Sequence, residues 1–327
     1  MKVRGVVGSL VDRAFIRLGA LVILIWKWRA SLWFRREHGR LPQLCPPAGF
    51  NDKVFWRKIV DRNPLFVVLN DKIAVRDWVR RQVPGLQLTR LLWTGADPEA
   101  LPASLLDQPV MIKHNASSGF NIHYDGQTPR RDDMVATLKA WMARTYGTRL
   151  SEWAYGQVTP AILVEEMLGY DDGSAPDNIN VHASRGVVLF ASVYRGDKRG
   201  RREIGFFDDS GTRLAMQMMD EVDPLPQDWV PSETLFKALE GARALSRDVD
   251  YARCDFMATE ADIWFNEMTT YTASGHLKLD NPALLDRLTE GWDLRQSWFL
   301  VTPQTGLREI YRRAMVRVMD RCQAVSQ

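Results

Sequence analysis

Two carboxylates, Asp255 and Glu267, are the residues whose types and spacing most directly suggest chemistry. They belong to two mostly apolar runs that a polar turn separates, as in a β-hairpin. If residues 260–262 form the loop, Ala258 pairs with Trp264, and Asp255 then lies directly opposite Glu267. Cross-strand partners have Cβ atoms about 4.5–5.5 Å apart, so the two carboxylates are placed to share hard cations through oxygen ligands.

The same register places a second pair, Arg253 and Thr269, on the same side of the sheet. A slip of one residue would put Asp255 and Glu267 on opposite faces and destroy the site. The alternative for this stretch alone is an ordinary surface hairpin with scattered charge.

Composition sets the broad class of the protein. The chain has 327 residues, 46% of them hydrophobic and 25% charged, so it can bury one large core or two moderate ones. The net charge of +3 is too small to indicate nucleic-acid binding. Three widely spaced cysteines without a CxxC pair indicate a reducing compartment and no structural zinc. Five scattered histidines give no histidine-based metal motif.

The first 40 residues are basic, with nine Lys or Arg against two acids. Residues 18–26 are continuously apolar, but a bilayer-spanning helix needs about 20 such residues. No cleavage site typical of a signal peptide follows. We expect an apolar helix with basic flanks that either lies on an anionic membrane surface or packs on the main domain with a solvated basic face.

Two lysines stand at positions suited to an anionic ligand. Lys72 falls in the first turn of a helix predicted over 71–82, where a positive charge opposes the helix dipole. It therefore needs either a carboxylate neighbour, such as Asp71, or an anion. Lys113 ends a short predicted strand and precedes the small-residue loop 115–121, which is either a cradle of N–H groups for phosphates or a plain hairpin turn.

Further along, a buried strand over 161–164 runs into Glu165 and Glu166, and a hairpin is predicted over 178–194. The stretch 195–202 is dense in positive charge, so it is either a solvated loop or a surface facing an anionic substrate.

Taken in order, these features resemble the ATP-grasp superfamily and, more closely, its TupA-like family, which is associated with teichuronopeptide and other surface-polysaccharide synthesis. The resemblance covers about residues 49–280. It is carried by the ordered set Phe50-Asn51-Asp52-Lys53, Asp61-Arg62-Asn63-Pro64-Leu65, Asn70-Asp71-Lys72-Ile73-Ala74-Val75-Arg76, the loop from Lys113 to Asn121, Arg253-x-Asp255 and Asn266-Glu267.

The resemblance implies an ATP-grasp α/β (α+β) fold in which two α+β subdomains clasp ATP. The implied nucleotide-binding residues are Lys72, Lys113, Ser117, Ser118, Gly119, Glu165, Glu166, Met167 and Leu168. Among them, 117–119 would form a mobile loop over the phosphates, and 165–168 a hinge whose backbone pairs with adenine. The implied Mg²⁺ ligands are Asp255, Glu267 and Thr269, and Arg253 would stabilise the transferred phosphoryl group.

Two positions depart from the family pattern. Thr269 replaces the usual asparagine and is a weaker oxygen ligand. Asn180 stands where a charged phosphate contact is expected, so Arg195 or Lys198 would take that catalytic role.

The expected organisation is a basic N-terminal helical segment (1–48), a helical subdomain (49–105), a lid and hinge (106–168), a catalytic subdomain (169–300) and a basic C-terminal helix (301–327). The expected activity is an ATP- and Mg²⁺-dependent ligase that joins a carboxylate to an amine, on small-molecule, glycan or lipid-linked substrates of cell-surface polysaccharide synthesis. The alternatives are a kinase or glycan-transfer enzyme, or a non-catalytic nucleotide-binding scaffold at the membrane. The expected location is the cytoplasm, at the inner face of the cytoplasmic membrane.

Overall fold

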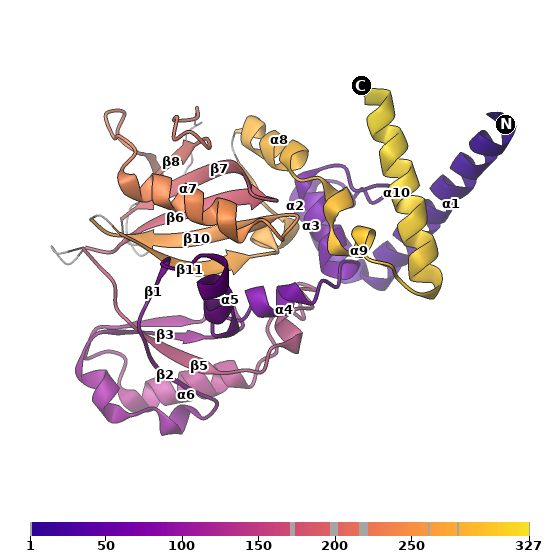
Figure 1. Cartoon of the computed structure of the whole chain (residues 1–327). Helices are drawn as coiled ribbons and strands as arrows, with labels where there is room; N and C mark the ends of the chain where they lie inside the picture. Colours follow the sequence, from indigo (N-terminus) through magenta and orange to yellow (C-terminus); the bar gives the residue numbers. More distant parts are fainter. Residues whose placement is uncertain are drawn as a thin grey trace. The chain divides into compact units, whose positions relative to one another are not determined.

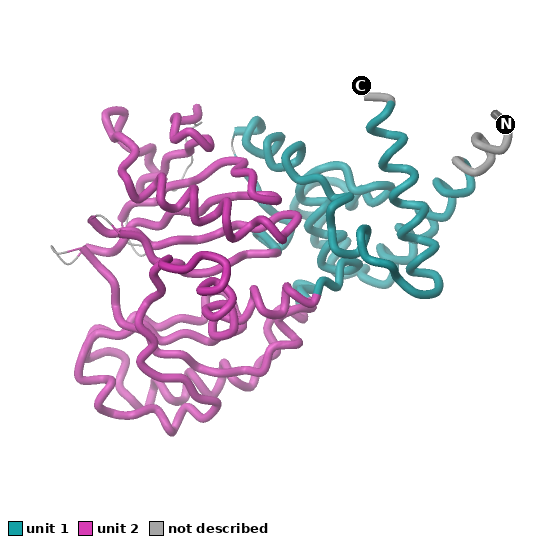
Figure 2. The backbone as a smooth tube through the Cα atoms, viewed as in Figure 1, with its two compact units in different colours: residues 1–63, 149–152, 271–327 teal, residues 64–148, 153–270 magenta. Residues whose placement is uncertain are grey.

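The computed structural model describes residues 2–170, 174–196, 202–215, 222–260, 262–279 and 281–326. The chain forms two compact units (Figure 2). Unit 1 comprises Met1–Asn63, Arg149–Glu152 and Tyr271–Gln327, and unit 2 comprises Pro64–Thr148 and Trp153–Thr270. The two ends of the chain therefore belong to the same unit. The five-part organisation expected from the sequence stays a prediction.

Unit 1 consists mainly of helices in its described part. They are α1 (Lys2–Trp26), α2 (Trp28–His38), α3 (Phe50–Ile59), α8 (Pro282–Gly291), α9 (Trp298–Val301) and α10 (Gly306–Ser326). The predicted apolar helix at the N-terminus is therefore present as α1. None of the helices in the described residues combines the length and the apolar character needed to cross a bilayer.

The described part of unit 2 contains a seven-stranded sheet in the order β1-β11-β10-β6-β7-β8-β9. Its strands are β1 (Gln87–Leu88), β6 (Asp177–Ser184), β7 (Val187–Arg195), β8 (Glu203–Phe207), β9 (Asp223–Pro224), β10 (Ala252–Ala258) and β11 (Ile263–Thr269). Helix α7 (Glu233–Leu245) lies along one face of this sheet (Figure 1). Gly241 allows the close approach, because a Cβ at that position would come within 3.2 Å of the Phe256 ring.

The same unit contains a four-stranded sheet in the order β2-β5-β3-β4, again counting the described residues. Its strands are β2 (Leu91–Gly95), β3 (Val110–His114), β4 (Asn121–Tyr124) and β5 (Ile162–Glu166). Helix α6 (Arg131–Met142) packs on it through Met134 and Leu138, which join a core that includes Ile112 and Val164. Two helices, α4 (Leu65–Leu69) and α5 (Ala74–Gln82), complete the unit. The predicted mixed α/β class, with two α+β parts and preceding N-terminal helices, is confirmed.

The hairpin β10–β11 has the predicted register at its functional end. Asp255 pairs with Glu267 and Arg253 with Thr269. Nearer the turn the prediction was wrong by one residue, because Ala258 pairs with Ile263 rather than with Trp264. A β-bulge reconciles the two registers, since Phe256 pairs with Phe265 and the next pair is Asp255 with Glu267. Asn266 is thus an extra residue on β11.

Candidate nucleotide site

Asp255 projects from the face of the large sheet opposite α7. Its strand neighbour Phe256 lies against α7, and successive residues of a strand point to opposite faces. On the two adjacent strands, Asn180 of β6 and Glu267 of β11 are in register with Asp255. A row of three oxygen-bearing side chains therefore crosses the face that α7 leaves uncovered.

Both carboxylates in this row have cationic partners. The guanidinium of Arg253 binds Asp255 in bidentate fashion, with Nε 2.7 Å from Oδ1 and Nη2 2.6 Å from Oδ2. The ammonium of Lys72 lies 3.4 Å from Oε2 of Glu267. Burial alone would raise the pKa of Glu267, but Lys72, Arg253 and Lys113 hold it below its ordinary value. Glu267 is therefore an anion at neutral pH.

Arg253 is also tied to Thr269, whose hydroxyl accepts a hydrogen bond from Nη2 at 3.3 Å. Burial opposes the charge of Arg253, but Asp255 and Glu267 together raise its pKa above the ordinary value. The structure therefore brings Arg253, Asp255, Glu267 and Thr269 together on one face, as the predicted register required.

Lys72 lies in a turn rather than in a helix, which corrects the expected helix start at residue 71. Helix α5 begins at Ala74, and the side chain of Asp71 accepts the N–H of Ile73. The backbone N–H of Lys72 donates to the carbonyl of Asn115, and its ammonium donates to the carbonyl of Ser117. The lysine is thus held between the loop after β3 and the carboxylate of Glu267.

Lys113 connects the two sheets of unit 2. Its ammonium lies 2.7 Å from Oε2 of Glu165 on β5 and donates to Oδ1 of Asn266, the bulge residue of β11, at 3.2 Å. Bulges redirect side chains and are over-represented next to active sites. The extra residue on β11 therefore brings an amide oxygen to the lysine of the smaller sheet.

Glu165 acts as a buried counter-ion through its side chain. Besides Lys113, it receives Nη1 of Arg76 at 2.7 Å and the hydroxyl of Thr89 at 2.6 Å. Burial would raise its pKa, but Lys113, Thr89 and Arg76 together lower it. Arg76 lies on α5 and is itself buried. Glu165 thus sets the position of two cations.

Two of the four residues expected to form a hinge, Glu165 and Glu166, lie within β5. Glu165 pairs with Leu91 and Met111, and the N–H of Glu166 donates to the carbonyl of Arg90. Because the sheet uses the backbone of these two residues, the expected backbone contact with adenine cannot involve the N–H of Glu166. Met167 and Leu168 follow the strand and are half-buried.

The loop after β3 is anchored at its base. Asn115 uses its side chain to bind Asp71, the carbonyl of Thr159 and the N–H of Ala161, at 3.1, 3.0 and 2.9 Å. Ser117 is buried, and its hydroxyl has no hydrogen-bond partner among the described residues. Ser118 and Gly119 are exposed at the tip. Of the expected loop 117–119, Ser118 and Gly119 are therefore accessible and Ser117 is enclosed, and the mobility of the loop stays a prediction.

Arg195, expected at the phosphates, is not brought to the site. The register Asn180–Ser192 on β6 and β7 places Arg195, three residues further along, on the opposite face of the sheet from Asp255. There it lies 3.8 Å from Asp177 and 3.9 Å from Glu203. Lys198 falls outside the described residues.

The donor set fits a magnesium ion that is held jointly with a nucleotide. Mg²⁺ is usually bound by one or two carboxylates plus substrate phosphates and water, rather than by a cage of protein ligands. Asp255 and Glu267 supply the two carboxylates on neighbouring strands. Among the described residues there is no group of three or more His, Cys, Asp or Glu that would hold a metal ion without such a co-ligand.

Two residues of the site, Arg76 and Asn266, belong to stretches that carry the resemblance but were given no role from the sequence. Arg76 occurs between the buried Val75 and Trp78 of α5. A charged residue among apolar positions of a helix could have indicated a buried ion pair. Asn266 precedes Glu267, and two adjacent polar residues interrupt the alternation of a half-buried strand, which is how a bulge shows in a sequence.

Comparison with solved structures finds ligases among the similar proteins. They include D-alanine–D-alanine ligase from Bacillus anthracis (TM-score 0.36, 16% identity, 80% of this chain and 70% of that chain), the ATP-grasp ligase PsnB complexed with a precursor variant, Mg and ADP (0.34, 16%, 69% and 60%), and phosphoribosylamine–glycine ligase from Thermotoga maritima (0.36, 12%, 64% and 50%). No family model matches the sequence, and a search of curated proteins gives no significant match. At these TM-scores the similarities assign neither family nor activity, so the function is inferred from the site.

Proposed function

We propose that this protein binds Mg²⁺–ATP at the polar face of the large sheet and uses it to join a carboxylate to an amine. The observation that carries the proposal is the convergence of four segments of unit 2 on one site. Lys72, Lys113, Asp255 and Glu267 come from a turn, β3, β10 and β11, and Lys72 contacts Glu267 while Lys113 contacts the adjacent Asn266. Two cations beside two carboxylates match the needs of a metal–triphosphate complex.

The residues have distinct tasks in this chemistry. Lys72 and Lys113 would neutralise phosphate oxygens, and Asp255 and Glu267 would hold Mg²⁺, which when bound supplies charge neutralisation at the β- and γ-phosphates. An oxygen of the substrate carboxylate attacks the γ-phosphorus, the bond to the bridging oxygen breaks, and ADP leaves. The amine then attacks the acyl carbon of the acylphosphate, inorganic phosphate departs, and the amine proton passes to solvent.

The charge state of the site favours a carboxylate over a hydroxyl as the phosphoryl acceptor. A hydroxyl acceptor needs a general base, whereas a carboxylate is already ionised at neutral pH. Three carboxylates of the site are each engaged by a cation, in the pairs Asp255–Arg253, Glu267–Lys72 and Glu165–Lys113. The fourth, Asp71, accepts hydrogen bonds from the N–H of Ile73 and the amide of Asn115. A group held as a charged partner of Arg or Lys is a weak base, so a ligase agrees with the site better than a kinase.

For the substrate class we propose an acidic glycan or its lipid-linked precursor, on the basis of the TupA-like resemblance of the sequence. A panel of uronic-acid sugars as carboxylate donors, with single amino acids as amines, samples this class.

The test is Mg²⁺-dependent ADP release in the presence of this panel, with product masses determined by mass spectrometry. We expect an amide product and its loss in Asp255→Asn and Glu267→Gln. Asp262→Asn is the matched control, because Asp262 lies at the turn of the same hairpin with 52% of its side chain exposed. A phosphate-ester product would identify a kinase, and ADP release that survives both site substitutions would refute the proposed site.

A further inference from the structure

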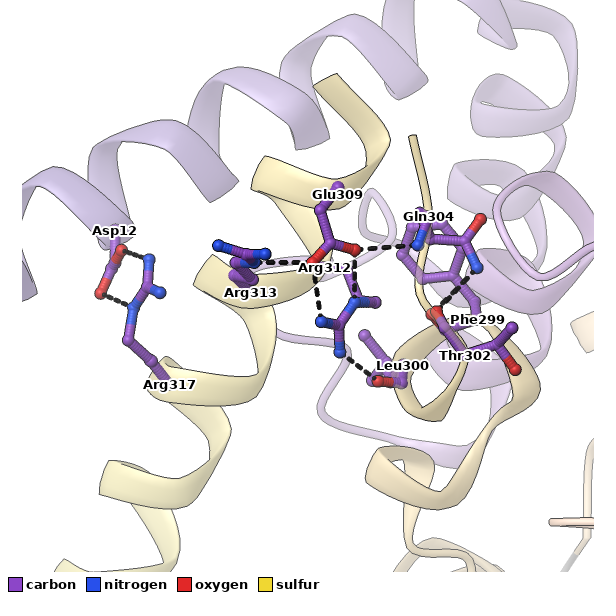
Figure 3. Close-up of polar contacts among 9 residues, drawn as sticks. All are labelled: Asp12, Phe299, Leu300, Thr302, Gln304, Glu309, Arg312, Arg313 and Arg317. Carbon is purple, nitrogen blue, oxygen red and sulfur yellow. Dashed lines mark hydrogen bonds and ion pairs between the residues drawn. The ribbon is translucent and has the colours of Figure 1, made fainter. Parts of the chain in front are cut away.

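Helix α1 has one face that packs within unit 1. Asp12 is buried and binds Arg317 of α10 through two hydrogen bonds, of 2.9 Å to Nε and 2.5 Å to Nη2 (Figure 3). Ile16 and Ala20 are buried on the same face. Gly19 lies against the Tyr311 ring, since a Cβ there would come within 2.8 Å of it. These contacts fix which side of α1 faces the protein.

The opposite side of α1 is apolar and exposed. Leu18 is 58% exposed and Ile25 is 64% exposed, although both are large aliphatic residues. At about 100° per residue, the exposed apolar positions fall within a continuous sector of about 160°. We define this α1 apolar face as Leu10, Val11, Leu18, Leu21, Val22, Ile25 and Trp26. Trp28 and Leu32, exposed on α2, follow it along the chain. Exposed apolar side chains gathered on one helix face are typical of a contact with a membrane or another protein.

Exposed arginines flank this face along one side of α1 and continue along α2. Arg13, Arg17 and Arg29 are exposed, as are Arg35 and Arg36. The acids of the same region are already compensated within unit 1. Asp12 is held by Arg317 and Arg321, and Glu37 lies 2.9 Å from the ammonium of Lys278. Arg40 is held by Asp52, whereas no ion pair of the described residues involves Arg13, Arg17 or Arg29. The charge of these exposed arginines is therefore left for an external partner.

From these observations we infer that the α1 apolar face docks in the plane of an anionic lipid surface. Apolar side chains would enter the boundary between headgroups and acyl chains, and the arginines would meet lipid phosphates. Trp26 and Trp28 suit this depth, because indole rings prefer the membrane–water interface. A second copy of the chain fits less well, since a symmetric contact through α1 would bring two arginine borders together.

The experiment is co-sedimentation of the full chain with vesicles of phosphatidylcholine alone or with phosphatidylglycerol at about a third of the lipid. We expect binding to the anionic vesicles, at least tenfold weaker binding for Leu18→Gln/Ile25→Gln, and a loss of about fivefold for each of Arg17→Gln and Arg29→Gln. The matched control is Val187→Gln/Val230→Gln, which changes two valines of unit 2 that are 60% and 76% exposed.

The variants of the α1 apolar face should melt at the temperature of the unmodified chain, because the side chains changed are exposed in the fold. Equal loss of binding in the Val187→Gln/Val230→Gln control would overturn the inference, and so would absence of binding to anionic vesicles. Light scattering after size exclusion tests the alternative that a second copy of the chain binds the α1 apolar face. A dimer that Leu18→Gln/Ile25→Gln dissociates, without vesicle binding, would assign the face to self-association instead. Vesicle binding is measured without ATP, so its failure is separate from failure of the ligase proposal.

Discussion

The carboxylate of Glu165 lies 2.7 Å from the ammonium of Lys113, across two neighbouring strands of the small sheet. The same carboxylate holds Arg76, so one buried anion orients two cations at the candidate site. Lys113 in turn reaches Asn266 on the large sheet. The positions of Lys113 and Arg76 therefore depend on Glu165, although the side chain of Glu165 need not contact the nucleotide.

Replacement of Glu165 by Gln should destabilise the fold, because it leaves two buried cations without their counter-charge. We expect the free energy of unfolding to fall by about 3 kcal/mol, as when one partner of a buried ion pair is removed. Urea unfolding measures this. Glu166→Gln is the control, since its partner Arg90 is 69% exposed and such pairs contribute about 1 kcal/mol or less. Equal effects of the two substitutions would contradict the assigned role of Glu165.

Replacement of Lys72 by Met should weaken ATP binding and leave stability nearly unchanged. The ion pair with Glu267 is partly exposed and contributes little to folding, whereas a lost phosphate contact reduces affinity by about tenfold or more. Isothermal titration of Mg²⁺–ATP measures the change. Lys237→Met serves as control, because Lys237 is a surface residue of α7 paired with Glu233 at 3.2 Å. Unchanged affinity in the Lys72 variant would remove this lysine from the site.

Replacement of Asn266 by Ala tests the bulge side chain. The substitution removes the 3.2 Å hydrogen bond to Lys113 and leaves the pairing of Asp255 with Glu267 intact. We expect the rate of ADP release to fall by about tenfold or more, because a hydrogen bond to a charged group contributes about 1.5–3 kcal/mol, with a melting temperature close to that of the unmodified chain. A large drop in melting temperature would instead make Asn266 a structural residue of the hairpin.

The stability of unit 1 should fall in mild acid because of His276. Burial lowers the pKa of His276 to about 4, and its ring stacks on Trp33 at 4.7 Å. The unfolded chain, with its histidine pKa near 6.5, therefore binds the proton first as the pH falls. The free energy of unfolding drops between pH 6.5 and about 4, by at most about 3 kcal/mol from this group.

His276→Phe keeps an aromatic ring against Trp33 but cannot be protonated. Urea unfolding at pH 7 and pH 5 should show a smaller loss of stability for this variant than for the unmodified chain. Identical losses in the two proteins would show that His276 does not titrate in this range.

The sequence predicted the parts of the site that depend on local pattern. Alternation placed Asp255 opposite Glu267, although the assumed loop was one residue too short, because the bulge at Asn266 compensates for that error. The start of α5 was missed because Lys72 is held by the carbonyls of Asn115 and Ser117, more than forty positions away, and helix propensity does not report contacts of that range. Arg195 was misplaced for a related reason: the face of a residue at a strand end depends on the exact pairing of β7.

The bulge on β11 separates the residues that the hairpin needs for strand pairing from a residue that contributes only a side-chain contact. Deleting Asn266 would leave Phe256 opposite Phe265 and Asp255 opposite Glu267, each side chain still on its present face. A hairpin shorter by one residue would therefore keep the same strand pairing and the same placement of the two carboxylates. The strand pairing therefore does not require Asn266. Its deletion would remove the hydrogen bond to Lys113. The extra residue on β11 thus serves the contact with Lys113 in the site and not the pairing of the strands.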